Sequence, residues 1–93
     1  MNTIKYNIIN KLIINKSIFI TLLIRVNNED DVEQALSNIK NEYNDATHYC
    51  YGYIVNNIKR CSDDGEPGGT AGLPILNTLE AHNLDLVLCV VVR

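Results

Sequence analysis

The sequence has little of what builds disulfide frameworks, zinc sites or membrane spans. Its three cysteines are an odd number, and no two of them have the C-x-x-C spacing. This pattern fits neither a disulfide framework nor a tetrahedral zinc site made by the chain alone, and it favours a reducing, cytoplasmic compartment. The apolar run over residues 18–24 is too short to cross a membrane, and no convincing cleavage site follows it. We therefore expect neither membrane insertion nor a targeting segment.

Positive charge is also scarce. The chain has 8 Lys and Arg against 11 Asp and Glu, which gives a formal net charge of −3 and a pI near 5.2. Any binding of nucleic acid therefore needs a local basic patch, because the overall charge does not attract phosphates. The 93 residues, of which 46% are hydrophobic, suit one small globular domain over residues 1–93.

Glycine and proline are rare outside one stretch. Residues 60–76 hold four of the five glycines and both prolines. Such a concentration predicts a rigid, shaped loop, with Gly65 and Gly69 in conformations of positive φ. Helical apolar spacing follows, which predicts a helix over residues 71–83. A glycine-rich loop that opens a helix can bind an anion, but neither G-x-x-x-x-G-K-[ST] nor G-x-G-x-x-G after a strand is present.

The acidic residues of this loop allow two interpretations. Asp63, Asp64 and Glu66 stand close together. Because neighbouring carboxylates repel one another, they could hold magnesium or calcium in a metal- or phosphate-binding, enzyme-like domain. Alternatively they cap nearby backbone N–H groups, as Asp and Ser do in turns. We favour capping, which requires no metal or cofactor.

Periodicity predicts the other elements. Residues 4–14 alternate irregularly like edge strands, and residues 18–26 alternate clearly. Asn28, followed by three acidic residues, marks the start of an amphipathic helix. Residues 84–92 are almost wholly apolar, as in a central strand covered on both faces. With a strand at residues 47–55, the order strand, strand, helix, strand, helix, strand predicts an α+β two-layer sandwich, with both helices on one face of a mixed sheet.

The strand at residues 47–55 places His48 and Cys50 on one face. They could form a Cys–His nucleophile pair, but no third orienting group is identifiable. We favour a buried thiol beside a hydrogen-bonded histidine, with Cys50 and Cys89 buried and Cys61 accessible.

Three tyrosines occupy the opposite face of this strand, namely Tyr49, Tyr51 and Tyr53. Aromatic side chains on a sheet surface can stack on the bases of single-stranded RNA. Tyrosine is also a favoured strand residue that packs its ring against neighbours. We favour packing, and exposure of the face distinguishes the two interpretations.

Residues 60–76 closely resemble the signature of the YigZ/IMPACT family, which usually reads S-D-D-G-E-P-S-G-T-A-G-x-P-I-L. Other segments agree with it. Residues 16–19 resemble the family's K-S-x-F, residues 46–53 its A-x-H-x-C-[YW]-A-Y, and residues 90–93 the start of its V-V-V-T-R-Y-F-G-G. The departures from the family pattern are Gly52, Gly68 and Val92.

The resemblance covers about residues 11–93 and the family's N-terminal domain. It implies the ribosomal-protein second-domain fold and a role around translation. We therefore expect a non-enzymatic binding domain, without catalytic or metal-binding residues, whose partner is the ribosome, RNA or a translation-related protein. The family continues after Arg93 with Y-F-G-G and a further helix. A truncated, non-functional fragment is thus another interpretation, and without that helix the uncovered sheet surface predicts self-association.

The expected binding residues come from the matching motifs. A basic patch of Lys59, Arg60 and Arg93 beside the loop would favour nucleic acid as the partner. The expected ligand- or partner-binding residues are His48, Arg60, Ser62, Asp63, Asp64, Gly65, Glu66, Gly69, Thr70 and Arg93.

Overall fold

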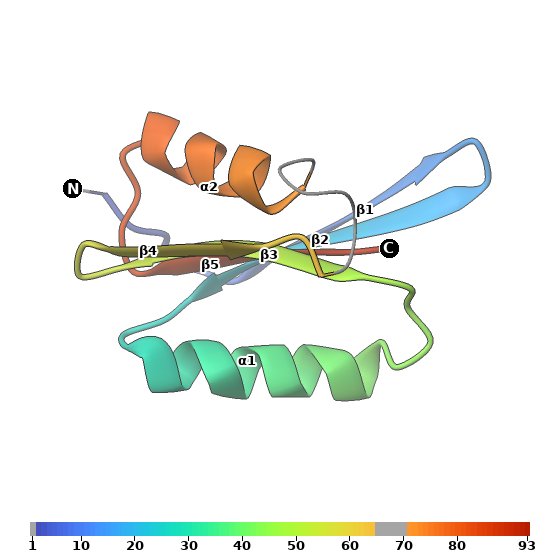
Figure 1. Cartoon of the computed structure of the whole chain (residues 1–93), viewed down its shortest axis with the longest axis horizontal. Coiled ribbons are helices and arrows are strands. Elements are labelled where there is room, and N and C mark those ends of the chain that lie inside the picture. The colour runs from blue at the N-terminus through green and yellow to red at the C-terminus, as the bar shows by residue number, and fades with distance from the viewer. Residues whose placement is uncertain (1, 65–70) are drawn as a thin grey trace.

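The computed structural model describes residues 2–64 and 71–93. In this part of the chain, five antiparallel strands form one sheet in the order β1-β2-β5-β3-β4, together with two helices (Figure 1). The elements are β1 (Ile8–Ile14), β2 (Ser17–Arg25), α1 (Glu29–Glu42), β3 (Tyr49–Val55), β4 (Ile58–Ser62), α2 (Gly72–Ala81) and β5 (Val87–Val92). The predicted α+β class is confirmed.

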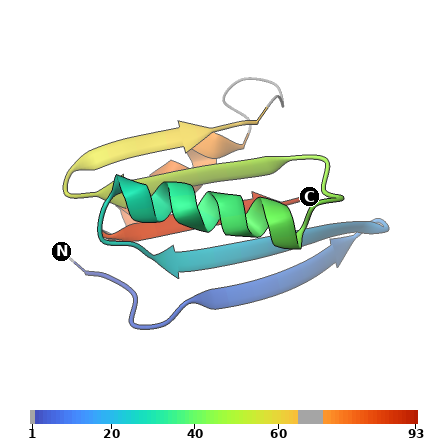
Figure 2. The same cartoon turned by 90° about the horizontal axis from the view of Figure 1, so that it is seen from below.

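The two helices lie on opposite faces of the sheet (Figures 1 and 2). The core on the α1 side contains Leu22, Val26, Val32, Ile39, Tyr53, Val55, Leu88, Val90 and Val92. The core on the α2 side contains Ile54, Leu76, Leu79, Val87 and Cys89. The prediction of two layers with both helices on one face is therefore wrong, and the predicted mixed sheet is wrong because every strand pair of the described sheet is antiparallel. Because β3 and β5 present apolar side chains on both faces, each face needs its own helix.

One strand, β4, was not predicted, because its residues adjoin the glycine-rich loop. It pairs with β3 through a two-residue connection, Asn56 and Asn57, with φ of 49° and 70°. Positive φ at both central residues is what a type I′ hairpin requires, and asparagine tolerates it. Asn15 and Lys16 join β1 to β2 in the same way. The Asn-Asn pair between two strand-like segments was the signal for β4.

Three predictions from local sequence signals are confirmed. Asn28 caps α1 by accepting a hydrogen bond from the Asp31 N–H at 2.8 Å. Asn83 follows α2 with φ of 54°, in the left-handed region. The strand predicted at residues 84–92 appears as β5, third of five in the sheet and almost entirely buried.

Helix α1 covers the tyrosine face of β3, so the packing interpretation is confirmed. Tyr53 is only 8% exposed, and its hydroxyl donates to the Glu29 carboxylate at 2.8 Å. Desolvation by burial, with this bond, raises the pKa of Tyr53 to about 12. Tyr49 and Tyr51 are half-buried against the same core. These rings therefore do not form an open platform for bases.

All three cysteines are free, with Cys50 and Cys89 buried on strands and Cys61 exposed, as predicted. Burial raises the pKa of the Cys89 thiol to about 11. Neither helix of the described residues is long and apolar enough to cross a bilayer.

Candidate functional site

Asp63 joins the end of β4 to the start of α2. Its Oδ1 accepts hydrogen bonds from the Ala71 N–H at 3.1 Å and the Gly72 N–H at 2.6 Å. The first amide groups of a helix have no partner within the helix, and a carboxylate there also meets the positive end of the helix dipole. Asp63 therefore caps α2 from a distant strand, and the capping interpretation is confirmed for this residue.

Asp64 and Ser62 shape the turn after β4. Asp64 has a φ of 49°, and its N–H donates to Ser62 Oγ at 3.2 Å. Its Oδ2 accepts from the Tyr49 N–H at 2.7 Å, which ties the turn to β3. This second carboxylate therefore also serves the backbone, and its bond to the Tyr49 N–H holds the start of the loop against β3.

His48 and Cys50 bind successive backbone carbonyls, those of Asp64 and Asp63. His48 Nδ1 lies 2.8 Å from the Asp64 carbonyl oxygen, and the Cys50 thiol donates to the Asp63 carbonyl at 3.4 Å. A carbonyl oxygen only accepts, so Nδ1 carries the hydrogen and Nε2 is the other ring nitrogen available to a ligand. The favoured interpretation, a buried thiol beside a hydrogen-bonded histidine, agrees with these contacts, and the Cys–His nucleophile pair stays an untested alternative.

The remaining loop predictions lie partly outside the structure. Four expected binding residues fall outside the described residues, namely Gly65, Glu66, Gly69 and Thr70. The expectation of positive φ at Gly65 and Gly69 therefore also lies outside them. Within residues 2–64 and 71–93, no three His, Cys, Asp or Glu side chains lie close enough together to hold a metal ion.

The predicted basic patch does not form. Lys59 Nζ pairs with Glu80 of α2 at 3.2 Å, and Arg60 Nη1 donates to the Lys59 carbonyl. Arg60 pairs with Tyr53 across the β3–β4 ladder, toward one end of β3. The backbone N–H of Arg93 donates to the His48 carbonyl beyond the other end. Five residues of strand correspond to about 16 Å, so these cations belong to different regions.

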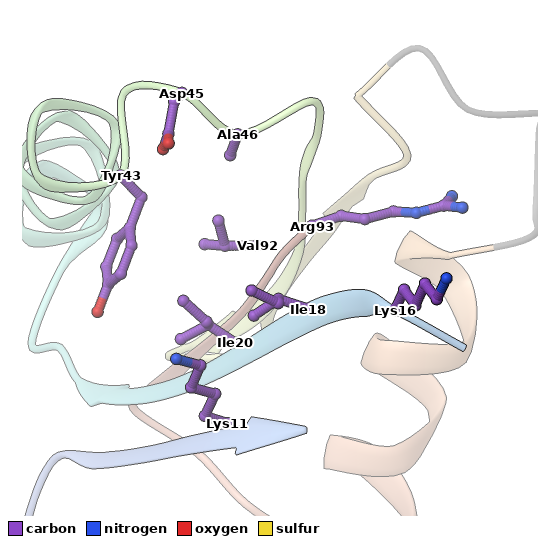
Figure 3. A pocket seen from close by; sticks show the side chains of 9 residues that line it. All are labelled: Lys11, Lys16, Ile18, Ile20, Tyr43, Asp45, Ala46, Val92 and Arg93. Atoms are coloured by element: carbon purple, nitrogen blue, oxygen red, sulfur yellow. The ribbon is translucent and has the colours of Figure 1, made fainter. Parts of the chain in front are cut away.

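Arg93 instead shares a pocket with two lysines of the β1–β2 hairpin: the ends of Lys16 and Arg93 lie on one side of it, and Lys11 lies on the other side, toward Tyr43 (Figure 3). Lys11, Lys16 and Arg93 line a pocket of about 380 Å³, in which Asp45 is the one acidic lining residue among the described residues. The other lining residues are Ile18, Ile20, Tyr43, Ala46 and Val92. Lys11 and Lys16 were not among the expected binding residues, although Lys16 begins the K-S-x-F segment, because only the hairpin brings them to the pocket that Arg93 lines.

A second pocket of about 490 Å³ adjoins the first. The two share Ile18 and Arg93, and the second is also lined by Ser17, Thr47 and His48. The backbone of Arg93 is held on both sides, since its N–H donates to the His48 carbonyl at 3.1 Å and its carbonyl accepts from the Thr47 N–H at 3.0 Å.

The Arg93 side chain is positioned as well. Its guanidinium carbon lies 5.7 Å from the centre of the Phe19 ring, within the range of a cation–π contact. The arrangement presents one held guanidinium, two lysines, two hydroxyls and an imidazole at one end of the sheet. Such groups bind phosphate oxygens by charge and by hydrogen bonds.

Comparison with known proteins agrees with the motifs. Residues 15–93 match the Impact N-terminal domain. The IMPACT family member YvyE of Bacillus subtilis is 38% identical over 86 residues, which cover 89% of this chain and 40% of that protein. The IMPACT family member YigZ of Escherichia coli is 34% identical over 85 residues, which cover 86% of this chain and 42% of that protein.

A solved structure shows the same fold. The chain superposes on a crystal structure of a hypothetical protein with a TM-score of 0.94 at 30% identity, covering 98% of this chain and 47% of that chain. The chain spans about 40% of the length of the curated relatives that it matches. From the motif at residues 60–76, the matched segment and the shared fold, this chain belongs to the IMPACT family, through its Impact N-terminal domain.

Proposed function

We propose that this domain is a non-enzymatic RNA-binding module with a role in translation, and that its partner is the ribosome or another RNA of the translation machinery. The observation that carries the proposal is the gathering of Lys11, Lys16 and Arg93 around one pocket. Family membership supports the translational context, because the resemblance implies it. The proposal concerns the binding domain and assigns it to the cytoplasm.

The local charge favours RNA despite the net charge of −3. Phosphate contacts from Lys and Arg release condensed counterions, and this term supplies most of the sequence-independent affinity. Cations on both sides of one pocket can contact more than one phosphate of a single strand. Three acidic residues lie in the first turn of α1, namely Glu29, Asp30 and Asp31. The three cations line a pocket near the other end of α1, so these acidic residues lie at the opposite end of the helix from the pocket.

Binding is favoured over catalysis by what the polar groups already do. Asp63 and Asp64 accept hydrogen bonds from backbone N–H groups, and His48 and Cys50 bind carbonyls. Side chains that bind the backbone in this way hold the loop and β3 in shape, as a binding surface requires.

Loss of the hairpin lysines should weaken RNA binding. The double variant Lys11→Gln/Lys16→Gln is expected to bind a fluorescein-labelled single-stranded RNA of about 12 nucleotides on the order of tenfold more weakly at low salt. The slope of log affinity against log salt concentration should fall by about 0.7 for each phosphate that the variant no longer neutralises. Fluorescence anisotropy over a salt series measures both quantities.

Lys59→Gln is the matched control, because it removes a lysine that is paired with Glu80 on α2 and does not line the pocket. It should leave the affinity and the salt slope unchanged. If the loss in log affinity per removed charge were the same for Lys59→Gln and the hairpin variant, only net charge would matter, and the proposed site would be rejected.

We further propose that the exposed hairpin lets two chains associate. Exposed large apolar side chains gather on β1 and the start of β2, namely Ile8, Ile9, Leu12, Ile13, Ile14 and Ile18. Strand β1 is also an edge strand whose outer N–H and C=O groups have no neighbouring strand in the described sheet. Long apolar edges of this kind pair with another chain unless they are covered.

Sedimentation velocity should therefore show a species whose size grows with concentration. Leu12→Lys should shift it to monomer, because the change adds a charge to the edge without touching the cationic pocket. Leu73→Lys, on α2 and similarly exposed, is the control and should not shift it. A strictly monomeric protein with a concentration-independent melt would contradict self-association.

A further inference from the structure

The floor of the pocket in Figure 3 is chemically unlike its rim. Ile18, Ile20 and Val92 supply an apolar floor from β2 and β5, and the rim carries the cations. A phosphate gains nothing from such a floor, because phosphate oxygens need charged or hydrogen-bonding partners. A nucleobase gains binding energy from an apolar floor, because its faces are apolar and stack or pack against side chains.

The wall of this pocket is well ordered by hydrogen bonds. Tyr43 ends α1, and its carbonyl accepts from both the Ala46 N–H and the Tyr49 hydroxyl. The Tyr43 N–H in turn donates to the Ile39 carbonyl at 2.8 Å. The half-buried Tyr43 ring therefore stands beside the cavity on a held backbone, where an aromatic ring can contact a base.

The adjoining pocket suits a phosphate instead. Its side chains include the Ser17 and Thr47 hydroxyls, the His48 imidazole and the Arg93 guanidinium, with no carboxylate among its described lining residues. Since the two pockets share Arg93 and Ile18, a base in one lies next to a phosphate in the other. The volume of about 380 Å³ is within the range of small-molecule sites.

We infer that the Tyr43 pocket takes one unstacked base of a single-stranded RNA while the adjoining pocket holds a neighbouring phosphate. This inference rests on the proposed RNA-binding function and adds the form of RNA that is recognised. A duplex keeps its bases paired and stacked, so it can reach the cations but not fill the pocket. The domain therefore selects single strands or unpaired loops.

Three ligands of equal length distinguish the contribution of the base to the binding affinity from that of the phosphates. They are a single-stranded RNA, the same strand without bases (an abasic ribose-phosphate chain), and the corresponding duplex. We expect the single strand to bind about tenfold more tightly than the abasic chain, the effect of one stacked base. A 2-aminopurine base in the strand should change its fluorescence on binding, which reports insertion without any variant.

The variant Ile18→Ala tests whether the base binds in the Tyr43 pocket. Ile18 is 47% exposed, so the change leaves the core intact while removing part of the pocket floor. It should weaken binding of the single strand severalfold and leave binding of the abasic chain unaffected. Ile13→Ala is the control, because Ile13 pairs with Ile18 across the hairpin, is 63% exposed and does not line the pocket.

The outcomes distinguish the two proposals. Equal affinities for all three ligands, with a steep salt dependence, would overturn the base pocket and leave the RNA-binding function standing. Binding of none of them would overturn both. A preference for the single strand that survives Ile18→Ala and is lost in Ile13→Ala would place the base elsewhere and overturn the assignment to this pocket.

Discussion

Replacing Gly72 with alanine is expected to lower the free energy of unfolding by about 3 kcal/mol. A Cβ at this buried position would lie 2.6 Å from the Ser62 carbonyl oxygen and 2.8 Å from its nitrogen. These are backbone atoms of β4, so no side chain can rotate away, and α2 must shift from the strand. Helix propensity alone predicts the opposite sign, a gain of about 1 kcal/mol for Gly→Ala.

Chemical denaturation with a two-state fit measures this difference. Asn77→Ala is the control, because Asn77 is exposed on the same helix. The higher helix propensity of alanine should raise the free energy of unfolding of this variant by about 0.5 kcal/mol. If Gly72→Ala were as stable as the parent, the close approach of α2 to β4 would not constrain this position.

Loss of the Asp63 carboxylate should have an effect of similar size. We expect Asp63→Ala to cost about 3 kcal/mol, because both the Ala71 and Gly72 N–H groups lose a charged acceptor at the start of α2. Asp63→Asn keeps an acceptor oxygen but not the charge, so it should cost roughly half as much. Thermal and denaturant unfolding of both variants gives the comparison.

Asp30→Asn serves as the matched control. Asp30 lies in the first turn of α1, and the cap of that helix comes from Asn28. The Asp30→Asn variant should lose less than about 1 kcal/mol in free energy of unfolding, which is the contribution of a charge near a helix end. Similar losses for Asp30→Asn and Asp63→Ala would mean that charge near a helix end, and not the paired hydrogen bonds of Asp63, stabilises the fold.

The features predicted correctly depend on neighbours in sequence. The cap at Asn28, the helix end at Asn83 and the buried run that forms β5 each have a cause within a few residues. The tyrosine face was assigned because alternation alone puts those rings on one side of β3.

The placement of the helices was wrong because alternation does not say which face a following helix covers. In β3, the face of Tyr53 and Val55 and the face of Ile54 are both apolar, so either could receive either helix. Only the order β1-β2-β5-β3-β4, with its crossovers, brings α1 to one side and α2 to the other. Strand β4 was missed because the composition of the loop outweighed its short alternating pattern.

The sequence by itself determined the family and the α+β class, since each depends on local spacing and residue type, whereas it only favoured capping by the acidic loop residues over metal binding. Only the tertiary structure decided where the cationic site lies. Lys11, Lys16, Tyr43 and Arg93 line one pocket because hairpin register and sheet order bring separate segments to the same end of the sheet. Distances between such segments depend on the whole sheet, and no local pattern in the sequence carries them.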